Sequence, residues 1–403
     1  MQTVVIAAVS WLAYTVLLVV VDMLTQHSVG RALMGLRRWV IGRRLDRRAI
    51  AIANGKVERG LTRFYRQTPL KEGLDALPYR PDAPIYSPPP WRGPGVTLLD
   101  RSASLIVTDG KTQETTDRAL LRKVRRRAAS LGVDVWDGPA LMVTHLPLDA
   151  SSPVRAKTAS YFDLAESIVP LEDEAFRHAD NRWRRLRVRR ALGDHFLDSP
   201  RGLGGVVALV VDDANGRPEI LIHKRSGAVA TNPGMWCVTP TYVVEDPQSS
   251  GKQQSVLGIE VHNVLREILE EVYGYPELNL PNRRIDPDWF LSLDLGEKLH
   301  KGISSGSVRC AHLGWYINLV NGLLDSITIV YASQDPELNA LLRRSVNADS
   351  AEVAAGLGQV VRWIPLDSAD LLKLRMAHDF HPGSALAIDL AQTFVSQIRG
   401  LNA

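Results

Sequence analysis

The chain has 403 residues, of which 45% are hydrophobic, so it is long enough for one large or two ordinary domains with a real core. Its 48 basic and 44 acidic side chains leave a formal charge of only +4, which excludes a uniformly polycationic or polyanionic chain. Two cysteines, Cys237 and Cys310, are too few for a disulfide framework and lack metal-site spacing. They favour a reducing compartment.

The first segment is strongly apolar. Residues 4–21 are apolar or small, apart from Ser10 and Thr15, and a run of this length just suffices to span a bilayer as a helix. A cleaved signal peptide is the alternative, but no Lys or Arg precedes the run and no clean cleavage pattern follows it. Arginines gather between positions 31 and 48, so the positive-inside rule places the C-terminal bulk in the cytoplasm. We expect a single-pass cell-membrane protein with a transmembrane anchor at 1–27.

Two further segments precede the predicted domains. In residues 28–76, apolar residues around Trp39 alternate with arginines, which favours a basic amphipathic helix on membrane lipid over a nucleic-acid-binding arm. The arginine-rich helix expected at 173–192 carries no base-reading motif, so we expect no sequence-specific nucleic acid as partner. Residues 77–95 contain seven prolines and predict an extended linker at a domain boundary.

Residues 96–200 are predicted to form an accessory α/β region. Strands are expected at 96–107 and 140–148, and helices at 115–131 and 173–192. The last of these carries six arginines around Trp183, which suit either a solvated face or an anion-binding surface. The region is either a separate domain or an extension of the one that follows.

The remaining residues, 201–403, differ in composition, with apolar β-branched runs separated by turn-forming residues. A β-branched run at 205–211, a turn-rich stretch and a second apolar run at 219–225 predict a β-hairpin. More strands are expected at 235–238, 242–244, 289–295, 310–319 and 359–364, and a closing helix at 384–398. Ser255 is the predicted N-cap of a helix. Its buried side would be formed by Val261, Val264, Leu265, Ile268, Leu269 and Val272.

That helix carries the most informative motif, Arg266-Glu267-Ile268-Leu269-Glu270-Glu271. Spacings of three and four residues bring its three carboxylates onto adjoining parts of one helical surface, where Arg266 can orient a carboxylate. Mg²⁺ or Mn²⁺ would relieve their mutual repulsion and also bind substrate phosphates. The alternative is a solvated acidic helix face.

The motif resembles that of the Nudix hydrolases, G-x5-E-x7-R-E-U-x-E-E-x-G-U, in which U is a bulky aliphatic residue; its R-E-U-x-E-E part is matched in full. A strand that ends at Arg225, followed by Asn232-Pro233-Gly234-Met235-Trp236, is also similar to the family pattern. The resemblance covers roughly 202–403. It implies an α+β fold, a Nudix-type α/β/α sandwich with a mixed sheet, here preceded by a single transmembrane helix and the accessory region.

The sequence departs from this family pattern near the motif. Gly258 stands where the family has a glutamate, with Glu260 two places late, and Tyr273 stands at the final glycine. Thr239-Pro240-Thr241 replaces a usual Gly-Gly pair. Glu260 shares a helical stripe with Glu267 and is a candidate outer ligand.

The resemblance implies a membrane-anchored hydrolase that acts with Mg²⁺ or Mn²⁺ on a nucleoside diphosphate linked to another moiety. Glu267, Glu270 and Glu271 would hold the metal and, with Arg266, form the catalytic group. The alternative is a catalytically weak sensor or effector that binds a nucleotide-type ligand at the membrane, and a third is a scaffold with a coincidental acidic helix. A homo-oligomer is an open possibility. Candidates for the general base are Glu297, Glu352 and Asp379, and candidates for phosphate contacts are His312, His378 and His381.

Overall fold

The computed structural model describes residues 51–52, 54–97, 105–108, 138–178, 186–225, 234–247, 255, 257–275, 286–333, 335–344 and 361–400. The chain divides into two compact units, Met1–Ile50 and Ala51–Ala403, and every described residue belongs to the second.

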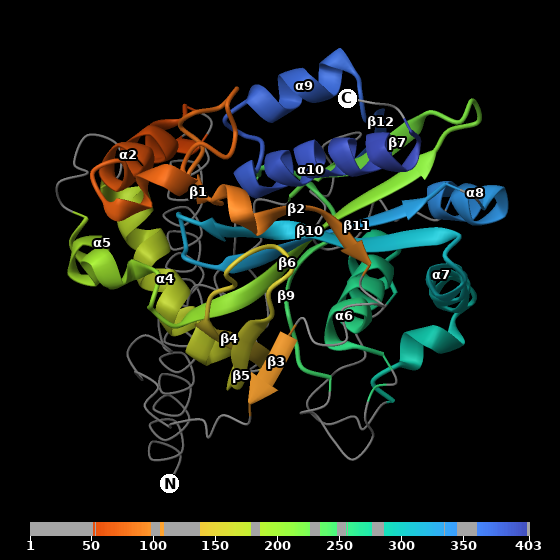
Figure 1. The fold of residues 1–403 in the computed structure, drawn as a ribbon, viewed down its shortest axis with the longest axis horizontal. Coiled ribbons are helices and arrows are strands. Elements are labelled where there is room, and N and C mark those ends of the chain that lie inside the picture. The colour runs from red at the N-terminus through yellow and green to blue at the C-terminus, as the bar shows by residue number, and fades with distance from the viewer. Residues whose placement is uncertain are drawn as a thin grey trace, which may run out of the picture. The chain divides into compact units, whose positions relative to one another are not determined.

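The described strands form one 12-stranded mixed sheet (Figure 1). They are β1 (Ile85–Tyr86), β2 (Arg92–Thr97), β3 (Leu105–Thr108), β4 (Pro139–His145), β5 (Val154–Ser160), β6 (Arg201–Asp212), β7 (Pro218–Lys224), β8 (Trp236–Val238), β9 (Thr241–Val243), β10 (Val308–Asn318), β11 (Leu324–Ala332) and β12 (Val361–Pro365). The main path runs β1-β10-β11-β6-β4-β5-β3, while β7, β8, β9, β12 and β2 pair at its sides. Of these pairs, β11 with β6 and β3 with β5 are parallel.

The helices cover both faces of this sheet. The α-helices are α2 (Lys56–Tyr65), α4 (Tyr161–His178), α5 (Arg187–Leu192), α6 (Ile259–Glu267), α7 (Asp294–Ser305), α8 (Pro336–Arg344), α9 (Ala369–Met376) and α10 (Pro382–Ile398). Short 3-10 turns are η1 (Pro69–Gly73), η2 (Pro89–Trp91), η4 (Gly193–Phe196) and η6 (Trp289–Ser292), and η5 (Ile268–Val272) is a π-helical turn.

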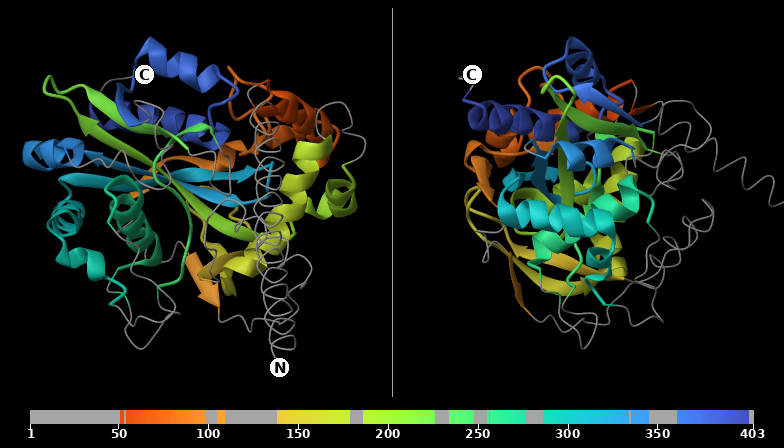
Figure 2. Two further views of the ribbon diagram at one scale, coloured as in Figure 1. Left: turned by 180° about the vertical axis from the view of Figure 1, so that it is seen from behind. Right: turned by 90° about the vertical axis from the view of Figure 1, so that its right-hand side faces the viewer.

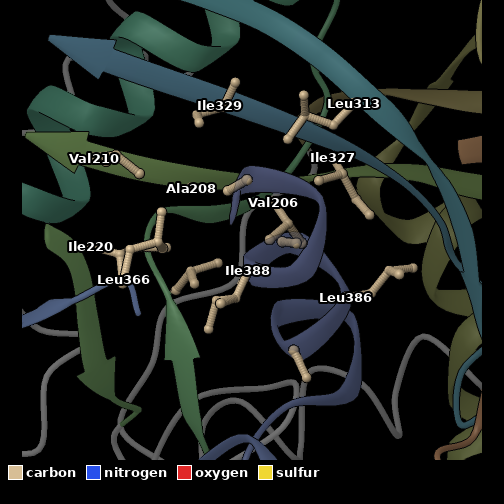
Figure 3. Packing of buried hydrophobic residues seen from close by; sticks show 14 of the residues in the cluster. Val206, Ala208, Val210, Ile220, Leu313, Ile327, Ile329, Leu366, Leu386 and Ile388 are labelled. Carbon is tan, nitrogen blue, oxygen red and sulfur yellow. The ribbon is translucent and has the colours of Figure 1, made fainter. Parts of the chain in front are cut away.

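β6 organises the core because it is apolar on both sides. Val206, Ala208 and Val210 face α10, and Figure 3 shows them packed with Ile388 and Ile329. The alternate residues Val207, Leu209 and Val211 belong to the opposite core, which α6 and α7 cover. A strand buried on both faces needs such a continuous apolar run. The predicted hairpin is confirmed, since β6 pairs antiparallel with β7 and Val210 lies opposite Ile220.

A third core lies at the other end of the sheet. The apolar side of α2, with Leu61 and Phe64, packs there together with Leu171 of α4 and Trp315 of β10. Figure 2 shows α2 and α4 side by side from behind. α2 is the helical part of the predicted juxtamembrane segment that falls among the described residues, and it is packed into the domain.

The Pro-rich residues 77–95 also lie within the fold. Ile85 and Tyr86 of β1 pair with Asn318 and Ile317 of β10, and Arg92 at the start of β2 pairs with Gly314. Proline is tolerated on edge strands, where a missing N–H removes no ladder hydrogen bond. The segment predicted as an extended linker therefore contributes edge strands to the sheet.

The predicted fold class is wrong in one element, the transmembrane helix. No helix within the described parts of the chain is long and apolar enough to cross a membrane. The longest of them, α4, has 18 residues and carries Asp163, Glu166 and Glu172. The run at 4–21 lies outside the described residues. The corrected class is α+β with a mixed sheet, and the localisation inferred from that run stays a prediction.

Two local predictions also differ from the structure. Residues 289–295 were expected as a strand, but they form η6 and the start of α7, because the neighbouring residues Trp289 and Phe290 both enter the same core. A strand would point them to opposite faces. The N-cap of α6 is Gly258, and not the predicted Ser255. The Ser255 hydroxyl instead donates to Asp288 Oδ1 at 2.6 Å.

Candidate functional site

The motif lies on α6 and η5, which pack against the sheet opposite α10 (Figure 1). The predicted buried side of this helix is confirmed: its six apolar residues are each no more than 3% exposed. After Glu267 the backbone changes from α-helix to π-helix. A π-helix closes its hydrogen bonds over five residues in place of four, so the angular positions of Glu270 and Glu271 differ from those of a regular α-helix.

Arg266 is the centre of the local charge arrangement. It is 1% exposed, and its guanidinium donates from Nη1 to Glu245 Oε2 at 2.9 Å and from Nη2 to Glu267 Oε1 at 2.5 Å. Asn263 holds the backbone of Glu245 in place, donating to its carbonyl at 2.8 Å and accepting from its N–H at 2.9 Å. The Glu267 carboxylate is therefore engaged by a buried arginine of its own helix.

Glu271 is engaged from another direction. Its Oε2 accepts the backbone N–H of Thr241, the first residue of β9, at 3.1 Å. The Thr241 hydroxyl in turn accepts from Arg225, which follows β7. This chain of contacts ties the π-turn η5 to the two strands β7 and β9.

Tyr242 completes the surroundings of the motif. Its ring lies over Gly205 of β6, where an added Cβ would come within 2.3 Å of Tyr242 Cζ. Burial, then the carboxylates of Glu267 and Glu260, hold the pKa of Tyr242 well above its ordinary value. Burial together with Glu260 also raises the pKa of the Cys310 thiol to about 12. Both groups are thus neutral near pH 7.

Two of the predicted metal ligands are hydrogen-bonded to other protein groups. Among the residues that the structure describes, no three His, Cys, Asp or Glu side chains are grouped so as to hold a metal ion. Mg²⁺ takes near-octahedral oxygen ligands at short range, and it needs converging carboxylates. The predicted ligands Glu267 and Glu271 bind protein donors instead, and Gly258 supplies no carboxylate. Glu270 lies on the same π-turn, half-buried.

The other candidates lie apart from the motif. Glu297 is exposed on α7 and pairs with Lys301 at 2.5 Å, and Glu352 lies outside the described residues. His312 Nδ1 is 2.9 Å from Ser326 Oγ. His378 pairs with Glu58 at 2.6 Å, and His381 caps α10, on the face across the sheet from α6. Asp379 lies between these two histidines in the sequence, and its backbone carbonyl accepts from the backbone N–H of Trp236.

Sequence reasoning missed several polar groups. Glu245 pairs with Arg266 across 21 positions and carries no motif signal. Asp325, buried in β11, stands within an apolar strand pattern. Lys224, Trp236 and Arg362 meet on one face of the sheet. Lys224 and Arg362 are polar positions within the expected strands at 219–225 and 359–364, and this was the sequence feature that could have indicated the group.

Comparisons with known proteins add little to this. No protein-family model matches the chain, and no curated protein matches it. A solved structure described as a Nudix hydrolase from Alicyclobacillus acidocaldarius is similar to it at 13% identity, with a TM-score of 0.23, covering 43% of this chain and 82% of that one. A similarity at this level does not assign the chain to a family.

Proposed function

We propose that the described domain is a divergent Nudix-type module that binds a nucleotide-type ligand without hydrolysing it in a metal-dependent manner. The sequence support is the full match to R-E-U-x-E-E, preceded by the predicted hairpin. The observation that carries the proposal is the engagement of the motif by the protein itself: Glu267 by Arg266, and Glu271 by the Thr241 N–H.

This engagement gives the motif a structural part in the fold. Arg266 joins Glu267 to Glu245 beyond the end of β9, and Glu271 joins η5 to the first residue of that strand. A catalytic metal would have to share both carboxylates with these donors. Charge-assisted hydrogen bonds of this kind are the stronger ones in proteins.

A metal-dependent diphosphate hydrolase is the second candidate function. It is favoured by the completeness of the six-residue motif. In that case a metal would neutralise the diphosphate and lower the pKa of an attacking water.

The two functions separate in one experiment on the full-length protein. A panel of nucleoside diphosphate compounds is titrated by calorimetry, and product formation is followed by ³¹P NMR with and without Mg²⁺ or Mn²⁺. We expect saturable binding and no turnover. Metal-dependent turnover that is lost in Glu270→Gln and Glu271→Gln, and retained in the exposed control Glu72→Gln, would refute the proposal and establish the hydrolase. Absence of binding and of turnover would refute both.

A further inference from the structure

A cluster of two cations and one indole lies on the face of the sheet opposite the motif. Trp236 of β8 is paired in register with Lys224 of β7, and β12 lies on the other side of β7, with Arg362 opposite Ile222. Lys224 Nζ is 5.7 Å from the centroid of the Trp236 ring, and Arg362 Cζ is 4.5 Å from it. We call these three residues the indole–cation cluster.

The cluster lies on the α10 side of the sheet. Trp236 packs against the core that contains Ile220 and Ile222, and Lys224 follows these residues at the alternating positions of β7. α6 and its glutamates belong to the opposite core. The acidic motif therefore lies across the sheet from the cluster and does not neutralise it.

Other arginines that stack on rings in this fold have polar partners. Arg343, over Trp363, pairs with Glu219 at 2.7 Å. Arg375, over Tyr79, pairs with Asp389, and Arg399, over Tyr331, pairs with Asp212.

A fourth such arginine, Arg201 over Phe196, donates to the carbonyl oxygens of Phe196 and Ser199. Lys224 and Arg362 differ from all of these. Within the described part of the chain, neither side chain forms an ion pair or a hydrogen bond. Arg362 is exposed and Lys224 is half-buried. Two like charges held over one indole repel each other, and neither has an ion-pairing partner among the described residues.

Backbone hydrogen bonds anchor Trp236, and two arginines lie close enough to affect the neighbouring His381. The backbone N–H of Trp236 donates to the backbone carbonyl of Asp379 at 2.8 Å. The backbone carbonyl of Trp236 accepts from the backbone N–H of His381 at 2.7 Å. Burial, then the charges of Arg225 and Arg80, lower the pKa of His381 to about 3, so this histidine is neutral and adds no charge of its own.

From this geometry we infer that Lys224, Arg362 and Trp236 form a binding site for the phosphate or diphosphate group of a small anionic ligand. The guanidinium offers two parallel donors and the ammonium a third, a combination that suits phosphate oxygens. The indole holds both cations and presents an apolar edge to whatever the phosphate is attached to. The inference does not rest on the proposed function, because it uses other residues on the other face of the sheet.

The test is calorimetric titration of the full-length protein with inorganic pyrophosphate, inorganic phosphate and a nucleoside diphosphate. We expect saturable binding that weakens as ionic strength rises, since the site is partly exposed. Arg362→Gln and Lys224→Gln should each weaken pyrophosphate binding by roughly fivefold to tenfold, as expected for loss of a charge-assisted contact. Lys373→Gln, an exposed lysine of α9, removes the same charge and should leave the affinity within about twofold, as expected for a screened charge outside the site.

The ring is tested separately. Trp236→Phe keeps an aromatic platform and Trp236→Leu removes it, and circular dichroism of each variant checks the fold. If the nucleoside diphosphate binds more tightly than pyrophosphate and loses that advantage in Trp236→Leu but keeps it in Trp236→Phe, the attached base also contacts the ring. Absence of binding, equal binding by the Arg362→Gln and wild-type proteins, or an equal loss in Lys373→Gln would overturn the inference.

Discussion

Asp325 provides the sharpest prediction, because it is a carboxyl group in the middle of the sheet. It lies on β11 between Tyr316 of β10 and Gly204 of β6, in register with both. An added Cβ at Gly204 would be 2.1 Å from Asp325 Oδ1, so only a glycine leaves room for the carboxyl group. Burial raises the pKa of Asp325 from its ordinary 3.8 to about 7.

The sign of the resulting pH dependence follows from proton binding. Between pH 3.8 and about 7 the folded state holds a proton on Asp325 that the unfolded state has released. The free energy of unfolding therefore falls as pH rises through this window. A difference of roughly three pH units, at about 1.4 kcal/mol each, corresponds to a loss of about 4 kcal/mol that is complete above the folded pKa.

The substitution Asp325→Asn keeps the shape of the side chain and removes its ionisation. Its free energy of unfolding relative to wild type should rise by about 4 kcal/mol between pH 4 and pH 9. Any cost of seating the amide, about 1–3 kcal/mol, is independent of pH and shifts the whole curve without changing its slope. Urea unfolding at a series of pH values measures the difference directly.

The matched control is Asp75→Asn, at an exposed position. Its difference from wild type should stay nearly flat over the same pH range. A flat difference for Asp325→Asn as well would show that Asp325 ionises in the folded state as it does in the unfolded chain, and the reasoning from burial would fail.

Two further predictions concern the motif helix and its neighbours. Arg266→Leu leaves the two carboxylates that it bridges without a cation, so it should lower the free energy of unfolding by about 3 kcal/mol, and a loss below about 1 kcal/mol in urea unfolding would contradict its bridging role. Gly296→Ala places a Cβ 2.0 Å from the Phe290 carbonyl oxygen and should cost about 1–3 kcal/mol as α7 shifts. Gly258→Ala meets nothing within 4 Å and is the control; because Gly258 is the N-cap of α6, it should cost no more than about 1 kcal/mol, and equal losses in both glycine variants would refute the packing argument.

The sequence predicted the elements whose burial follows a short repeat along the chain. The alternating burial of β6 and the apolar side of the motif helix follow from periods of two and 3.6 residues. The strand expected at 289–295 failed because its apolar residues also suit a short helical turn, and the choice depends on a core supplied by distant segments. The prolines of 77–95 predicted a linker. The segment contributes an edge strand because Ile85 pairs with Asn318, which lies 233 positions away in the sequence.

The candidate sites show the same limit. The order of charges in Arg266-Glu267-x-x-Glu270-Glu271 is visible in the sequence, but their partners, Glu245 and the Thr241 N–H, come from the arrangement of β9 beside the helix. The indole–cation cluster requires β12 to join β7, which brings Arg362 within reach of Trp236 across 126 positions. Neither partner set is encoded by spacing along the chain.

The placement of the two candidate sites restricts how a ligand can use them. The motif helix and the indole–cation cluster lie on opposite faces of one sheet, and a packed layer of side chains extends about 10 Å from each face. A single nucleotide cannot contact both through that core. If pyrophosphate binds at Lys224 and Arg362 while a nucleotide binds beside α6, the two should bind with nearly independent affinities. A coupling of more than about tenfold, measured by titrating one ligand at saturation with the other, would show that β7 and β9, joined through Arg225 and Thr241, transmit binding from one face to the other.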